Sequence, residues 1–118
     1  MPVSYITHKS RKILHVDFKD LKDKEKVLEN LEEMVKFYKT ATEEIYLLFD
    51  VRGCFTDPEV MDKLKNYGKN VFKGKSRKRA VLGVAGIKGL LLRAYSLFTN
   101  TEVATFEDIE EAKNYLAD

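Results

Sequence analysis

Five side chains between residues 50 and 57 have the types that can do chemistry: two carboxylates, a cation, a thiol and a hydroxyl. They are Asp50, Arg52, Cys54, Thr56 and Asp57, in the stretch YLLFDVRGCFTDPEV (46–60). Clustered carboxylates bind metal ions or accept phosphoryl groups, a thiol near a helix N-terminus gains thiolate character, and a threonine hydroxyl can be phosphorylated. The stretch is therefore a candidate loop for binding a partner or a ligand.

Each of these residues also has a purely structural explanation. Asp50 can accept hydrogen bonds from its own loop or pair with Arg52, and we expect this in preference to an acidic metal or phosphoacceptor cluster with Asp57. Cys54 is expected to be a small apolar residue under a turn, since no histidine is obviously placed to act as its base. Two histidines are too few and too isolated for a metal site. We therefore expect no catalytic residue, no metal and no cofactor.

A second candidate site lies in GVAGIKG (83–89), where Gly86 and Lys88 could contact an anion. Its glycines match neither the dinucleotide fingerprint nor the Walker A loop. A tight turn from a strand into a helix is the expected explanation, with an anion site as the alternative. The basic run KGKSRKR (73–79) is expected to be a solvated loop.

Apolar periodicity predicts the elements that position these residues. Strands are expected over 3–7, 12–18, 44–51, 78–85 and 102–106, and helices over 23–38, from 58 to about 74, over 86–98 and from 109 to 116. His15 lies on the less apolar face of its strand, which we expect to be an open or partner-covered surface.

Two helix starts carry capping signals. Thr56 or Asp57 is expected to cap the second helix, with Pro58 in its first turn and Glu59 reaching back to Thr56 as in a capping box. For Thr56 we expect this capping role in preference to phosphorylation. Asp108 is expected to cap the last helix.

Strands alternating with helices predict an α/β fold with a parallel or mostly parallel sheet. Ligands in such folds lie beyond the carboxyl ends of the strands. The candidate loop at 50–57 follows the most apolar strand, so it is predicted to lie at this edge of the sheet.

Composition limits the classes of function. A chain of 118 residues is expected to be a single domain over 1–118, and a net charge of +2 gives no reason to expect nucleic acid as a partner. The one cysteine fits a reducing compartment, so we expect a cytoplasmic protein. No stretch is long and apolar enough for a transmembrane segment.

The segment LLLRAYSLF (90–98) is apolar nearly all round, more than a helix on one sheet face needs. We expect an apolar patch of Leu91, Leu92, Tyr95 and Phe98 that meets a partner, a second copy or an apolar ligand. The alternative is that a neighbouring helix covers it.

The strand ending in LLFDVRGCFTDPEV, the strand KRAVLGV and the closing TFEDIEEAKNYL together resemble the STAS superfamily, and most closely its stand-alone SpoIIAA-like branch, also called STAS/SEC14-like. The resemblance covers roughly residues 12–117. It implies a SpoIIAA-like β–α superhelix with a four- or five-stranded, mostly parallel sheet and helices mainly on one face. It also implies a regulatory or binding module and not a catalyst.

The loop departs from the pattern of the anti-sigma-antagonist STAS domains, in which a serine after the central strand is phosphorylated. That position falls near Asp57–Pro58 here, and Thr56 is the nearest candidate phosphoacceptor. The sequence thus favours a non-catalytic STAS-type module that binds a protein partner or itself through the loop and the apolar helix. The alternative is a small carrier of an apolar or lipid-like ligand, and an enzyme is the least supported class.

Overall fold

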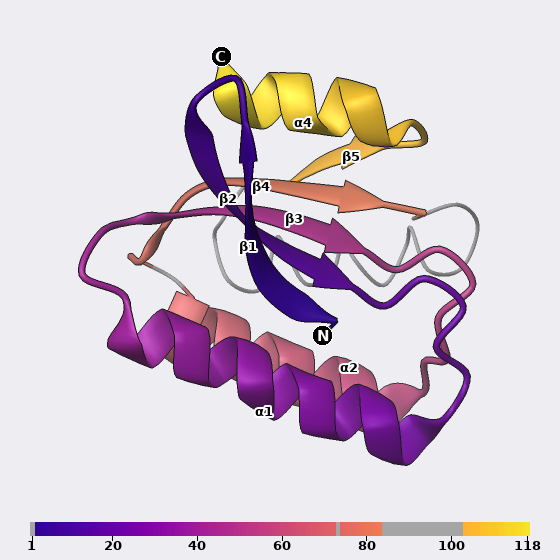
Figure 1. Cartoon of the computed structure of the whole chain (residues 1–118). Helices are drawn as coiled ribbons and strands as arrows, with labels where there is room; N and C mark the ends of the chain where they lie inside the picture. The colour runs from indigo at the N-terminus through magenta and orange to yellow at the C-terminus, as the bar shows by residue number, and fades with distance from the viewer. Residues whose placement is uncertain (1, 73, 84–102) are drawn as a thin grey trace.

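The computed structural model describes residues 2–72, 74–83 and 103–118. Its centre is a five-stranded sheet with the order β1-β2-β3-β4-β5 (Figure 1). The strands are Val3–His8 (β1), Arg11–Asp17 (β2), Ile45–Asp50 (β3), Ser76–Leu82 (β4) and Ala104–Phe106 (β5). β1 pairs with β2 antiparallel, and the other neighbours pair parallel. The predicted α/β fold with a mostly parallel sheet is confirmed.

The described helices are Lys24–Thr40 (α1), Pro58–Tyr67 (α2) and Ile109–Ala117 (α4), and α2 continues into one turn of π-helix at Gly68–Phe72 (η1). α1 and α2 lie on one face of the sheet and α4 lies on the other (Figure 1). Helices thus lie mainly on one face, as expected. The helix predicted over 86–98 falls outside the described residues.

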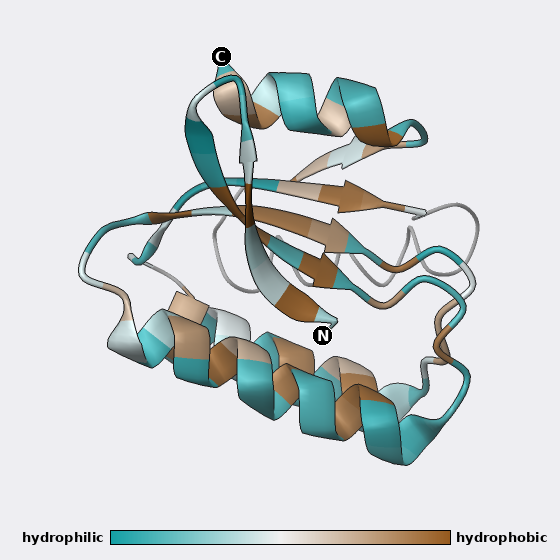
Figure 2. Cartoon of the chain, viewed as in Figure 1, coloured by the Kyte–Doolittle hydropathy of each residue, from teal (hydrophilic) through white to brown (hydrophobic). Residues whose placement is uncertain are grey.

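Two apolar layers hold the helices to the sheet, because successive residues of a strand point to opposite faces. In β3, Leu47 and Phe49 pack with α1 and α2, while Leu48 packs with Ala112 and Leu116 of α4. Figure 2 shows apolar residues on the sides of α1 and α2 that face the sheet. The face that carries His15 is covered by α4, so the expectation of an open surface there is wrong.

The helix starts follow the capping rules, and of the two caps expected for α2, Thr56 or Asp57, the structure has Asp57. The carboxylates of Asp23, Asp57 and Asp108 cap α1, α2 and α4, and each accepts a backbone N–H from the first turn. Asp57, with an extended backbone (φ −153°), accepts from the N–H of Val60 at 2.9 Å. Thr56 is therefore not the cap of α2, and the capping box that we expected between it and Glu59 is replaced by the single Asp57 cap.

The prediction that the basic run at 73–79 is a loop is wrong for its second half, because β4 begins at Ser76. Pairing with β3 starts at this residue and reaches Arg79 opposite Leu47. Arg79 is only 3% exposed, so its guanidinium lies inside the protein. No helix in the described part of the chain is long and apolar enough to cross a membrane.

Candidate functional site

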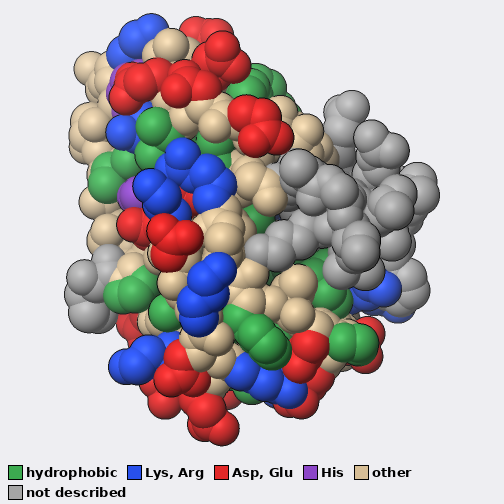
Figure 3. Space-filling view, turned by 90° about the vertical axis from the view of Figure 1, so that its right-hand side faces the viewer, with side chains coloured by type: hydrophobic (Ala, Val, Ile, Leu, Met, Phe, Trp, Pro, Cys, Tyr) green, Lys and Arg blue, Asp and Glu red, His purple; other side chains and the backbone are tan. Residues whose placement is uncertain are grey.

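The candidate loop lies at the carboxyl end of β3, where the fold was expected to place it. It is tied to the neighbouring segment 17–22, which follows β2. Three backbone hydrogen bonds join the two segments: Phe18 N to Asp50 O (2.9 Å), Asp20 N to Arg52 O (2.8 Å) and Phe55 N to Leu21 O (2.8 Å). These hydrogen bonds hold the loop to the segment 17–22. Figure 3 shows this side of the molecule, on which basic and acidic side chains are interspersed.

The Asp50 carboxylate and the Arg52 side chain form an ion pair at the base of the loop. Arg52 Nε donates to Asp50 Oδ1 at 3.0 Å, and Arg52 Nη2 donates to Asp50 Oδ2 at 2.7 Å. The backbone N–H of Arg52 also donates to Oδ1 at 3.1 Å. Asp50 is 2% exposed, whereas the Arg52 side chain is 33% exposed. The structural role expected for Asp50 is therefore confirmed.

This ion pair makes a pH dependence of stability predictable. Burial by itself raises the pKa of Asp50, but the hydrogen bonds and charge of Arg52 outweigh it, so the net pKa lies below its ordinary value. A depressed folded-state pKa stabilises the protein above the unfolded-state pKa of about 3.9, and this contribution is lost as the pH falls through the folded-state pKa. Urea unfolding below about pH 4 should show a fall in stability that is shallower in Asp50→Asn. An identical fall in both proteins would contradict this role.

Two glycines let the loop pack closely against its neighbours. Gly53 has φ +66°, and a Cβ there would lie 2.3 Å from the Asp20 carboxylate. Lys22 Nζ donates to the carbonyl of Gly53. Gly83, just after β4, has φ +87°, and a Cβ there would lie 2.7 Å from Arg52 Cα. The backbone that carries the ion pair is therefore pressed directly against Gly83.

Cys54 is buried, at 8% exposure, under the turn of the loop. Its thiol donates to the carbonyl of Phe55 at 3.2 Å, and its backbone N–H donates to Val51 O at 3.1 Å. The prediction of a small residue under a turn is confirmed. A thiol in this position is covered, as a structural cysteine is.

Asp57 links the two helices beneath the loop as well as capping α2. Lys24 Nζ, at the start of α1, lies 2.8 Å from Asp57 Oδ2 and 2.9 Å from Glu59 Oε1. The hydrogen bonds to Asp57 and Glu59 raise the pKa of Lys24. The hydrogen bond from Lys24, followed by that from the Val60 N–H, lowers the pKa of Asp57. The Asp57 carboxylate is thus occupied by a lysine and by a helix N–H group, and the Glu59 carboxylate by the same lysine.

The Thr56 hydroxyl oxygen is buried and has no hydrogen-bond partner among the described residues. A buried hydroxyl without a partner is destabilising, and valine has the same shape without the hydroxyl. Thr56→Val is therefore expected to raise the free energy of unfolding by about 1 kcal/mol, measured by urea denaturation. Thr56→Ser, which keeps the hydroxyl, is the control and should not be stabilising. A destabilised valine variant would show that the hydroxyl has a partner in solution.

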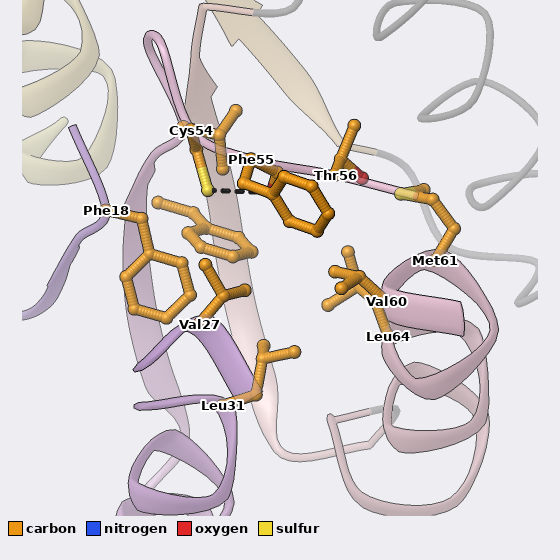
Figure 4. Close-up of a pocket in the computed structure, with 11 residues that line it drawn as sticks. Phe18, Val27, Leu31, Cys54, Phe55, Thr56, Val60, Met61 and Leu64 are labelled. Atoms are coloured by element: carbon orange, nitrogen blue, oxygen red, sulfur yellow. Dashed lines mark hydrogen bonds between the residues drawn. The ribbon is translucent and has the colours of Figure 1, made fainter. Parts of the chain in front are cut away.

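An apolar cavity of about 40 Å³ lies under the loop (Figure 4). The side chains around it come from the sheet, the loop and the facing sides of α1 and α2. They are Phe18, Val27, Leu31, Phe49, Val51, Cys54, Phe55, Thr56, Val60, Met61 and Leu64. Thr56 brings the only hydroxyl to this lining. The cavity is a structural feature that the sequence did not predict.

The chemistry available in the described part of the loop is that of binding. Its carboxylates are engaged by cations and by N–H groups, and its thiol is covered. No group of three or more potential metal ligands occurs within residues 2–72, 74–83 and 103–118. The remaining candidates lie outside the described residues: the anion contacts Gly86 and Lys88, and the apolar patch of Leu91, Leu92, Tyr95 and Phe98.

The burial of two polar residues of the sheet, His15 and Arg79, was not expected from the sequence. His15 Nε2 is buried without a hydrogen-bond partner among the described residues. Burial lowers the pKa of His15, against the opposing charges of Asp17 and Asp50. Arg79 is the buried cation of β4. Alternation along the strands was the available signal for both, because it places each residue on a face that a helix covers.

Comparisons of the chain with protein-family models, with curated proteins and with solved structures found no match.

Proposed function

We propose that the chain is a non-catalytic regulatory or protein-interaction module of STAS type, which binds a partner through the loop at 50–57. The observation that carries this proposal is the ion pair between the buried Asp50 and the partly exposed Arg52, which holds the loop in one conformation. The resemblance of the strand and loop sequence to STAS domains supports it. The single, covered thiol of Cys54 fits a reducing compartment, so the module is proposed to act in the cytoplasm.

A loop fixed in advance suits protein binding because less conformational entropy is lost when the complex forms. The backbone bonds from Asp20 and Phe55, and the ion pair of Arg52, remove that freedom before any partner arrives. The interspersed charges on this side (Figure 3) would contribute to partner selection and the rate of association more than to affinity. The apolar patch of 91–98 remains the second proposed contact.

Affinity capture from the native cell extract, followed by calorimetry with the purified partner, tests this proposal. Lys19 follows β2 in the segment bonded to the loop, and it is exposed. Lys19→Glu is expected to weaken binding by about 1 kcal/mol, the upper end of the range for one exposed charge. Lys39→Glu is the matched control, because Lys39 is an exposed lysine in the last turn of α1, away from the loop. Equal binding by both variants would contradict a loop interface.

The apolar cavity favours one alternative function, a carrier of a small apolar ligand. Its lining is apolar apart from the Thr56 hydroxyl, which has no described partner and could bond to one polar group of a ligand. At about 40 Å³ it is smaller than the cavity of about 150 Å³ that takes up benzene. A lipid-like ligand would therefore have to separate α1 from α2.

Native mass spectrometry of gently purified protein distinguishes the two functions. Extra mass that organic extraction removes would favour the carrier. The cavity-filling variant Val27→Phe should then reduce the fraction of loaded protein, since Val27 lines the cavity from α1. Protein of bare mass, with no change after extraction, supports the interaction module.

A further inference from the structure

β1 is an edge strand, and alternate backbone groups along it point away from the sheet. The N–H of Asp17 donates to the carbonyl of Pro2 at 2.7 Å, which fixes the phase of the antiparallel pairing. Since hydrogen-bonded and non-hydrogen-bonded pairs alternate, Ser4, Ile6 and His8 bond to β2. The N–H and C=O groups of the residues between them point outward. Those residues are Val3, Tyr5 and Thr7.

The outward groups are accessible at Tyr5 and Thr7. Both residues are exposed, and Tyr5, at 37%, is the one exposed large hydrophobic side chain among the described residues. Val3, by contrast, is 2% exposed. No described residue donates to or accepts from the outward backbone groups of Tyr5 and Thr7. The open part of the edge is thus centred on Ile6.

The β1 strand has none of the charged residues, prolines or bulges with which many monomeric proteins prevent another strand from pairing with a sheet edge. Its sequence, VSYITH, contains no lysine, arginine, acidic residue or proline, and its pairing with β2 has no register shift. Natural edge strands are generally short, charged, bulged or covered. Six uncharged residues with an exposed tyrosine form a ready template for another strand.

We propose that β1 is a self-association surface, on which the β1 strand of a second copy of this chain pairs antiparallel. Each Tyr5 then lies opposite Thr7 of the other copy, the two-fold axis passes near Ile6, and the two sheets become one. The β1 strands themselves contain no lysine, arginine or acidic residue. This dimer lies apart from the loop at 50–57, so it can fail without the proposed function failing.

Charge complementarity favours a second copy as the occupant of this edge. The β1–β2 turn is basic, since Lys9, Arg11 and Lys12 occur within it or just after it. Lys9 and Ser10 have φ +49° and +68°, which makes the turn tight and keeps Lys9 at the end of the hairpin, whereas Arg11 lies over the Tyr46 ring and Lys12 over the Tyr5 ring. Antiparallel pairing brings the basic turn of each copy to the end of the other hairpin, where β2 finishes with Asp17.

Sedimentation velocity over a range of concentrations, with Thr7→Pro and Thr7→Ala, tests the dimer. Proline removes the outward N–H of Thr7, which β1–β2 pairing does not use, so the fold should tolerate it. We expect Thr7→Pro to raise the dimer Kd about thirtyfold, because each copy loses one hydrogen bond, and Thr7→Ala to leave it within about threefold. A wild-type monomer at every concentration, or a dimer that Thr7→Pro leaves intact, would overturn the proposal.

Amide hydrogen exchange of the wild-type protein locates the interface without any variant. In dilute protein the amides of Tyr5 and Thr7 should exchange fast and those of Ile6 and His8 slowly, as the alternating pairing requires. In concentrated protein the amides of Tyr5 and Thr7 should slow by at least tenfold. A dimer in which these two amides still exchange fast would show that the copies meet elsewhere.

Discussion

Replacing Gly83 by alanine is expected to destabilise the protein by about 3–4 kcal/mol, the range of severe backbone and packing defects. Gly83 has φ +87°, and a Cβ there would lie 2.7 Å from Arg52 Cα and 2.8 Å from Arg52 N. These are backbone atoms, so the clash is relieved only if the loop moves as a whole. Urea unfolding followed by circular dichroism measures the effect, and the displaced loop should also bind a captured partner more weakly.

Gly74→Ala is the matched control for this experiment. Gly74 has nearly the same φ, +84°, but no atom lies within 4 Å of the position of a Cβ. Only the conformational preference of glycine is lost, which costs about 1 kcal/mol. If both variants were destabilised equally, the close packing of Gly83 on Arg52 would have no part in holding the loop.

Removing the Asp50 carboxylate is expected to cost about 2–3 kcal/mol, somewhat below the range for breaking a fully buried ion pair. Asp50→Ala removes the acceptor of two side-chain bonds and one backbone bond from Arg52. The partly exposed Arg52 can regain water, which limits the loss. Arg52→Ala should cost at least as much, since it leaves the more deeply buried Asp50 carboxylate without its cation.

A double-mutant cycle isolates the interaction between the two side chains. Thermal and urea unfolding of Asp50→Ala, Arg52→Ala and the double variant should give a coupling free energy of about 1–3 kcal/mol. The double variant is then less destabilised than the sum of the single ones. Additive effects would mean that the two side chains stabilise the loop independently, contrary to the ion pair described above.

Much of the fold was predictable because its signals are local. Alternating apolar residues marked β2, and the near-continuous apolar run of 44–51 marked β3 as a strand covered on both faces. Asp108 stands just before a periodic helical segment and caps it, as predicted. The structural roles of Asp50 and Cys54 followed from the short distance in sequence between each residue and its partners.

The features that were missed depend on contacts between distant segments. Thr56 and Asp57 are adjacent and both can cap a helix, so only the backbone path selects Asp57. The covering of His15 depends on α4, far along the chain. Arg79 ends a basic run that was expected to be solvated. It lies instead in β4 opposite Leu47 of β3, and its side chain is buried. Gly83 gave no sign of its contact with Arg52, which lies in another loop.

Site-specific photo-crosslinking in living cells tests most directly whether the loop at 50–57 is a partner-binding surface. A photoreactive amino acid would replace Lys19, beside the loop, and in a second protein Lys39, in the last turn of α1. We predict a discrete crosslinked product with another protein from position 19 and none from position 39. No product at position 19, or the same product from both positions, would contradict binding through the loop.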